Sequence, residues 1–263
     1  MAMTYWQQAR ADFPRWCLRI WAAAVIIAAV VYLLSYTTPL SRLVYLGTVL
    51  FGVFTGLLYL GRLIRVRSWA GAVVMLALIG LASWVVFAGR PPDADRLRAA
   101  YVRRLLAFRG TAYVWGGETH VGVDCSGLAR VALMEAMVSE GVREANPRLL
   151  GPMLWRFWWQ DIGTKGMLSQ AYGYTRPVFH PQKLAGYAPD DLQPGDLAVI
   201  GHMHVLMYIG DDRWIEANPD EHRVIVTTAT PASSHPWFNL SGTHLRWWML
   251  EDAGENETPR RPR

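Results

Sequence analysis

The strongest pattern in the sequence is a set of three apolar runs before Arg90. They extend over residues 20–36, 43–61 and 68–89, and none of them contains a charged residue. Each run is close to the ~20 residues that a helix needs to cross about 30 Å of hydrocarbon. The pattern therefore predicts three transmembrane helices, an all-α membrane region over residues 20–90. Residues 1–19 mix aromatic side chains with arginines, as a cytoplasmic or interfacial segment would.

A signal peptide and a soluble helical hairpin both fit these runs less well. A cleavable signal peptide would have one short apolar stretch followed by a cleavage site with small residues. A buried helical hairpin in a soluble protein would need a much larger protein to cover every face of three uncharged helices.

The arginines between the runs predict an orientation. Three of them precede the first run and three lie between the second and third, whereas Arg42 is the only one between the first and second. The positive-inside rule then places the N-terminus in the cytoplasm and the C-terminal part of the chain outside. The arginines after the third run, beginning with Arg90, argue against this orientation, but long domains translocate largely regardless of charge.

Residues 91–252 have the mixed pattern of an α+β domain. Helical periodicity predicts one helix over residues 94–108, capped by Asp93 or Asp95 and closed by Gly110, and a second over residues 125–140 that ends near Gly141. Alternation predicts strands at residues 196–200, 205–209, 214–217, 224–228 and 245–250. The last residues, 253–263, have no apolar pattern, and we expect them to be disordered.

Between the second helix and the strands lies an aromatic-rich insertion, residues 141–191, that contains LWRFWWQ. These rings could form a lid or cleft wall, or anchor the domain in a membrane interface. We favour a third interpretation, in which they complete the core of the domain, because buried aromatic rings dominate core energetics.

Composition and charge change this picture little. Hydrophobic residues make up 52% of the chain, and the formal charge is +5. The arginines near the N-terminus flank apolar runs and form no lysine-rich block, so we expect no nucleic-acid partner. The two cysteines, Cys17 and Cys125, would lie on opposite sides of a bilayer. This excludes a disulfide framework and leaves Cys125 free to react.

Cys125 follows a short polar residue, Asp124, at the predicted start of a helix. The unpaired N–H groups there favour a thiolate, which is the nucleophilic form. His204 lies in a predicted strand and could act as the base for this thiol. A nucleophilic cysteine and a histidine base are the two side chains that thiol acyl transfer requires. His202 is a rival base two residues earlier. We expect no metal or other cofactor, because this part of the chain has no second cysteine at ligand spacing.

Three segments, YVWGGETHVGVDCSG, LQPGDL and HVLMYIG, occur in this order. In them the chain resembles the NlpC/P60 family of papain-like cysteine peptidases, which cleave cell-wall peptides. The resemblance covers none of the residues before Arg90. It implies a papain-like α+β fold with an antiparallel sheet and a catalytic pair of Cys125 and His204. It also implies a substrate-binding role for Tyr113, Asp124 and Ser126, the last two near a free peptide amine.

The third catalytic position departs from the commonest pattern of the family. The family normally has a polar residue, often histidine, twelve positions after the base, and here that position is Glu216. A carboxylate can orient the imidazole and stabilise the imidazolium, so the change need not abolish activity. Asn218, two residues further on, is a weaker alternative.

By resemblance, the substrate would be the peptidoglycan stem peptide, cut between D-glutamate and the following diamino acid. Two alternatives stay open: an amidase or acyltransferase acting on a lipid-linked substrate, and a weakly catalytic cell-wall binding or scaffolding module. We expect a multi-pass protein of the bacterial inner membrane whose catalytic domain faces the periplasmic side. Its partners would be the lipid bilayer and an unidentified membrane protein.

Overall fold

A computed structural model of the chain describes residues 22–23, 26–27, 30, 47, 50–58, 61, 68–87, 89–184, 192–229 and 235–251. The chain divides into two compact units, Met1–Gly80 and Leu81–Arg263. Residues 50–58 of the first unit are helical, within the second predicted apolar run. Helix α4, Ser68–Phe87, lies within the third run.

The predicted membrane region is only partly covered by the described residues. Most of the first two apolar runs, the segment 1–19 and the tail 253–263 lie outside them, as does Cys17. Among the residues that the structure describes, none of the helices combines the length and the apolar character that a membrane span requires. The three transmembrane helices are therefore not confirmed.

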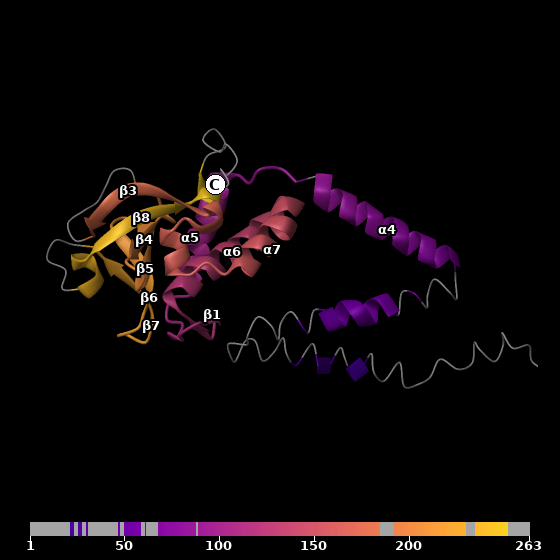
Figure 1. Ribbon diagram of the computed structural model, residues 1–263, viewed down its shortest axis with the longest axis horizontal. Coiled ribbons are helices and arrows are strands. Elements are labelled where there is room, and N and C mark those ends of the chain that lie inside the picture. Colours follow the sequence, from indigo (N-terminus) through magenta and orange to yellow (C-terminus); the bar gives the residue numbers. More distant parts are fainter. Residues whose placement is uncertain are drawn as a thin grey trace, which may run out of the picture. The chain divides into compact units, whose positions relative to one another are not determined.

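The second unit contains a six-stranded sheet with the strand order β3-β8-β4-β5-β6-β7 (Figure 1). Every neighbouring pair of strands is antiparallel. The strands are β3 Thr175–Lys183, β4 Leu197–Ile200, β5 His204–Gly210, β6 Arg213–Asn218, β7 Arg223–Thr228 and β8 Ser241–Trp247. The predicted α+β class with an antiparallel sheet is confirmed.

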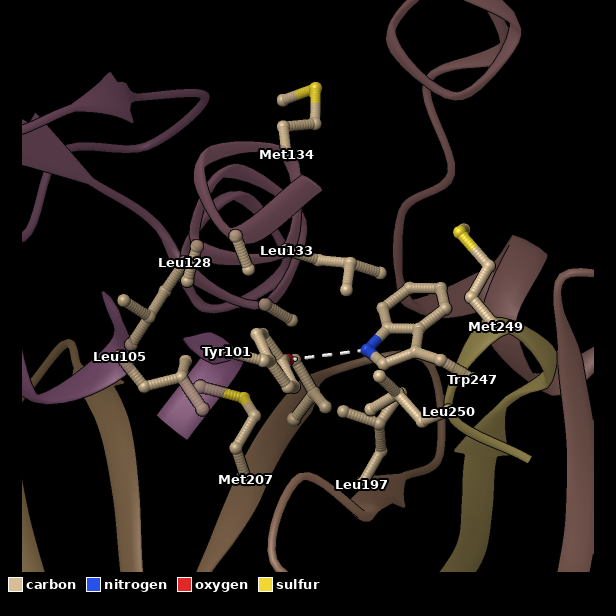
Figure 2. Close-up of a cluster of buried hydrophobic side chains, with 14 of the residues drawn as sticks. Tyr101, Leu105, Leu128, Leu133, Met134, Leu197, Met207, Trp247, Met249 and Leu250 are labelled. Carbon is tan, nitrogen blue, oxygen red and sulfur yellow. Dashed lines mark hydrogen bonds between the residues drawn. The ribbon is translucent and has the colours of Figure 1, made fainter. Parts of the chain in front are cut away.

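Both faces of the central strands are buried. On one face, Leu197 and Met207 pack against helices α5 (Ala94–Ala107) and α6 (Cys125–Arg143), as Figure 2 shows for part of this core. On the other face, Leu206 and Trp214 pack against Phe238 of the short helix η3, Pro236–Asn239. Strands covered on both sides read as continuous apolar runs, which is the pattern of LAVI in β4.

Helix α5 forms as predicted. The Asp93 side chain caps it by accepting a hydrogen bond from the Arg96 N–H at 3.0 Å. Tyr101 is fully buried, and its hydroxyl accepts a hydrogen bond of 3.2 Å from the Trp247 indole N–H (Figure 2). This bond ties α5 to the end of strand β8.

Helix α6 begins at Cys125 as predicted, and it continues slightly past the end predicted near Gly141. The helix continues to Arg143 and includes Gly141. A Cβ atom on Gly141 would lie 2.8 Å from Cγ of Leu150. Gly141 therefore allows Leu150 to approach the helix closely, and it does not end the helix.

The segment 141–191 contributes to the core of the domain. It contains η1 (Leu149–Met153), α7 (Leu154–Gln160), α8 (Thr164–Leu168), η2 (Ala171–Gly173) and β3. Phe157 is fully buried and packs edge-on against Trp247, which supports the interpretation as core. Trp155 and Trp159, by contrast, are 52% and 56% exposed.

Two strand predictions need correction. Strand β3 was not predicted, because Pro177 and Pro181 interrupt its pattern. Proline is tolerated there because β3 is an edge strand, with β8 as its one neighbour in the described sheet. The last strand ends at Trp247 and not at residue 250, because Trp248–Leu250 form the short helix η4. A small hairpin, β1 (Glu118–Thr119) and β2 (Gly122–Val123), precedes α6.

Candidate active site

Asp124 fixes the start of the helix that carries Cys125. One carboxylate oxygen accepts hydrogen bonds from the Gly127 N–H at 2.6 Å and from the Ser126 hydroxyl at 3.1 Å. The other oxygen accepts from the Gly116 N–H at 2.9 Å. Asp124 is therefore an N-cap that also ties the preceding glycine turn to the helix.

The Cys125 side chain lies against the start of strand β5. Its thiol points to the Met203 carbonyl oxygen at 4.0 Å, and the backbone of Val205 also hydrogen-bonds to the sulfur. These two residues flank His204 in the sequence. The fold therefore places the Cys125 sulfur against the backbone on either side of His204, although α6 and β5 are far apart in the chain.

Burial raises the pKa of the Cys125 thiol to about 11, and the negative charge of Asp124 acts in the same direction. Backbone N–H groups at the helix start, including that of Ser126, lower the pKa of the thiol, but by less than burial and Asp124 raise it. The expectation of a thiolate is therefore wrong for the free domain. Only 5% of the side chain is exposed, and the cost of desolvating a charged sulfur exceeds the effect of the helix terminus.

His204 and Glu216 form a buried pair on the neighbouring strands β5 and β6. His204 is the first residue of β5, and its Nε2 hydrogen-bonds to Oε2 of Glu216 on the neighbouring strand β6. Neither side chain is more than 2% exposed. A neutral imidazole has one N–H and one acceptor nitrogen. Because Nε2 donates to the carboxylate, Nδ1 is the nitrogen that can accept a proton.

Asn218 contacts Glu216 and not the imidazole. Its Nδ2 donates to Oε1 of Glu216 at 3.2 Å. Its Oδ1 accepts from the backbone N–H groups of Asp220 and Glu221 at 2.8 and 2.9 Å. Of the two predicted candidates for the third position, Glu216 is thus the one that lies against His204.

Sequence reasoning missed His235. Its Nε2 atom lies 2.8 Å from Oε1 of Glu216. Two residues later, the Trp237 ring stacks on the His204 imidazole at a centroid distance of 4.5 Å. Neither residue belongs to a strand, and no motif includes them. The rival base His202 is exposed in the turn between β4 and β5.

Of the predicted substrate-binding residues, Asp124 and Ser126 flank Cys125 in the chain, and Tyr113 lies close enough to feel its charge. Burial raises the pKa of Tyr113 to about 12, and the charges of Cys125 and Asp124 add to this effect. The Tyr113 hydroxyl therefore lies within electrostatic reach of both. The Ser126 hydroxyl donates to Asp124, as described above.

Part of the segment 141–191 borders the same site. A Cβ atom on Gly163 would lie 4.0 Å from the Ser126 hydroxyl oxygen. The Thr164 hydroxyl donates to the His202 carbonyl oxygen at 2.9 Å. These contacts place residues 163–164 beside the start of α6 and the β4–β5 turn.

An antiparallel sheet, a cysteine at the start of a packed helix and a buried histidine–carboxylate pair are features that papain-like cysteine hydrolases combine. The family model of the NlpC/P60 family matches residues 110–240. These residues are an NlpC/P60 family domain, which makes the protein a hydrolase of the cysteine-peptidase type and a cell-wall peptidase in its broad class.

Solved structures of the same family are similar to the chain. The NlpC/P60 domain of the peptidoglycan hydrolase SagA is 24% identical, with 50% of this chain and 88% of that chain covered and a TM-score of 0.32. The P60 domain of an antigen from M. avium subspecies paratuberculosis is 18% identical, with 61% and 100% covered and a TM-score of 0.34.

The peptidoglycan hydrolase RipB from Mycobacterium tuberculosis is 19% identical, with 64% of this chain and 76% of that chain covered and a TM-score of 0.34. A search of curated proteins finds no match. Because these TM-scores are below 0.5, the family assignment rests on the match to the family model.

The raised pKa of Cys125 gives a testable pH dependence. Asp124→Asn removes the negative charge beside the sulfur, which stabilises the thiolate and lowers the pKa of Cys125. We expect the rate of Cys125 alkylation to rise at lower pH in this variant than in the wild type. Asp93→Asn is the matched control, because Asp93 caps α5 and not the cysteine helix. Identical alkylation profiles for wild type and Asp124→Asn would contradict this cause of the raised pKa.

Proposed function

We propose that the domain hydrolyses an amide bond of the peptidoglycan stem peptide through a thioester on Cys125. The observation that supports the chemistry is the buried His204–Glu216 pair, together with the contact of the Cys125 sulfur with the residue before His204. The substrate class follows from the NlpC/P60 domain and from two similar proteins, SagA and RipB, that are peptidoglycan hydrolases. The bond cut would be the one between D-glutamate and the diamino acid.

The raised pKa of Cys125 determines the first step. The sulfur is a neutral thiol near pH 7, so Nδ1 of His204 takes its proton as the sulfur attacks the carbonyl carbon. The carbon–nitrogen bond then breaks, and His204 gives this proton to the leaving amine. A thioester remains on Cys125. His204 next removes a proton from water, the hydroxide attacks the thioester, and the thiol regains its proton as the carboxylic acid leaves.

The other groups of the site support these steps. Glu216 holds Nε2–H of His204 and stabilises the imidazolium that forms during each proton transfer. The N–H groups at the start of α6, which already hydrogen-bond to the sulfur, would donate to the oxyanion.

Asp124 would also meet the free amine of the substrate, with Tyr113 and Ser126 beside it. Its carboxylate accepts three hydrogen bonds within the protein. A carboxylate has about four acceptor positions, so one stays available for an ammonium group. Capping the helix and binding the amine are therefore compatible roles.

Mapping the products released from purified muropeptides by mass spectrometry tests this function. We expect the full-length wild type to cut between D-glutamate and the diamino acid, and Cys125→Ala to release nothing. His204→Ala should lower the rate by about 10²–10⁴-fold, as loss of a general base does. His202→Ala is the matched control and should keep its activity, because this side chain is exposed in the turn. Cleavage of lipid-linked substrates alone would instead favour the amidase or acyltransferase alternative.

We also propose that the protein is anchored in the bacterial inner membrane with the catalytic domain on the periplasmic side. The support is the three uncharged apolar runs and the arginines that flank them. Protease added to intact spheroplasts should then degrade residues 91–252 and leave the N-terminal region protected. Degradation only after lysis, or release of the chain by alkaline washing, would contradict the anchoring or its orientation.

A further inference from the structure

The segment that includes His235 and η3 covers the His204–Glu216 pair. His235 reaches Oε1 of Glu216 at 2.8 Å, and Trp237 stacks on the His204 ring. Phe238 is fully buried in the core on the same face of the sheet as Trp214. One short stretch of chain, anchored by Phe238, therefore contacts both the base and its carboxylate.

The hydrogen bonds of Asn218 decide which atom donates at this carboxylate. The Asn218 Oδ1 accepts two backbone N–H groups, so its Nδ2 must face Glu216. Nδ2 carries two hydrogens, and it lies 3.2 Å from Oε1 of Glu216 and 3.4 Å from Nε2 of His235, so its position alone does not fix the hydrogen of His235. A bare Nε2 lone pair 2.8 Å from a carboxylate oxygen would be repelled. Nε2 of His235 therefore carries a hydrogen and donates it to Glu216.

The two oxygens of Glu216 thus have separate partners. Oε1 accepts from His235 and Asn218, and Oε2 accepts from His204. Glu216 is fully buried, so water cannot replace a lost donor. With Oε1 held, the carboxylate plane cannot rotate, and Oε2 stays directed at the imidazole.

We propose that His235 is a positioning residue for the hydrolytic site and acts through Glu216. This inference rests on the proposed function, in which His204 needs its Nε2–H held so that Nδ1 receives the Cys125 proton. His235 extends the predicted cysteine–histidine–glutamate set by one residue. Because His235 contacts the carboxylate that holds His204, its loss should appear in the chemical steps, which kcat reports.

Steady-state kinetics of the full-length protein on muropeptides tests the proposal. His235→Leu should lower kcat by about 10- to 100-fold, the loss of one hydrogen bond to a charged group, with KM unchanged. His235→Gln, whose amide can donate from the same region, should recover most of this loss.

A double-mutant cycle separates positioning from a general effect on the fold. If His235 acts through Glu216, His235→Leu should have little further effect on kcat in a Glu216→Gln background. An unchanged kcat in His235→Leu would overturn the proposal. Two other results would also overturn it. One is that His235→Leu lowers kcat as much in the Glu216→Gln background as in the wild type, and the other is that His235→Gln lowers kcat as much as His235→Leu does.

Proton NMR gives a readout that does not depend on turnover. The His204 Nε2–H should produce a downfield resonance that disappears in Glu216→Ala, shifts in His235→Leu and is retained in His235→Gln. A wild type that cuts no muropeptide but shows these shifts would refute the proposed function and leave the positioning role intact. A resonance unchanged in His235→Leu would refute the positioning role itself.

Discussion

The carboxylate of Glu216 is fully buried on strand β6 of the antiparallel sheet, and a buried charge must be met by hydrogen-bond donors. The donors come from three parts of the chain: His204 from β5, Asn218 from β6 itself, and His235 from the segment after β7. Removing one partner of such a group leaves it uncompensated, which costs more than the bond contributes. The arrangement of β5, β6 and the η3 segment is thus coupled to the chemistry of one side chain.

The packing of α6 against the sheet places the sulfur and also sets its protonation. Leu128 and Leu133 of the helix are fully buried in the core shared with the strands, so Cys125 meets β5 in a largely dry environment. This environment keeps the thiol neutral, with a pKa of about 11. A neutral thiol needs a base at the moment of attack, which makes the orientation of His204 more important than it would be for a preformed thiolate.

Local patterns were sufficient to predict much of the fold. The start of α6 at Cys125 and the strands β4 to β7 followed from capping residues and short apolar runs, because these signals depend on neighbours in sequence. The end of α6 did not follow, since Gly141 is explained only by the close approach of Leu150. Strand β3 was missed because its prolines are tolerated only at a sheet edge, and the edge position is a property of the assembled sheet.

The candidate site shows the same contrast between features that depend on neighbours in sequence and features that depend on the assembled fold. Cys125, His204 and Glu216 were predicted by motif and spacing. In the fold His204 hydrogen-bonds to Glu216, and the Cys125 sulfur contacts the backbone next to His204. The pKa of Cys125 was predicted in the wrong direction, because the helix terminus is visible in sequence and the depth of burial is not. His235 was missed because its contact with Glu216 depends on where a chain segment without regular structure returns to the sheet.

The central claim is that catalysis proceeds through a covalent thioester on Cys125. The most direct test is mass spectrometry of the intact protein after rapid acid quenching during turnover of a muropeptide. We expect a mass increase on Cys125 equal to the acyl half of the cleaved peptide, which hydroxylamine removes. Continued turnover by protein whose Cys125 has been completely alkylated would contradict the claim.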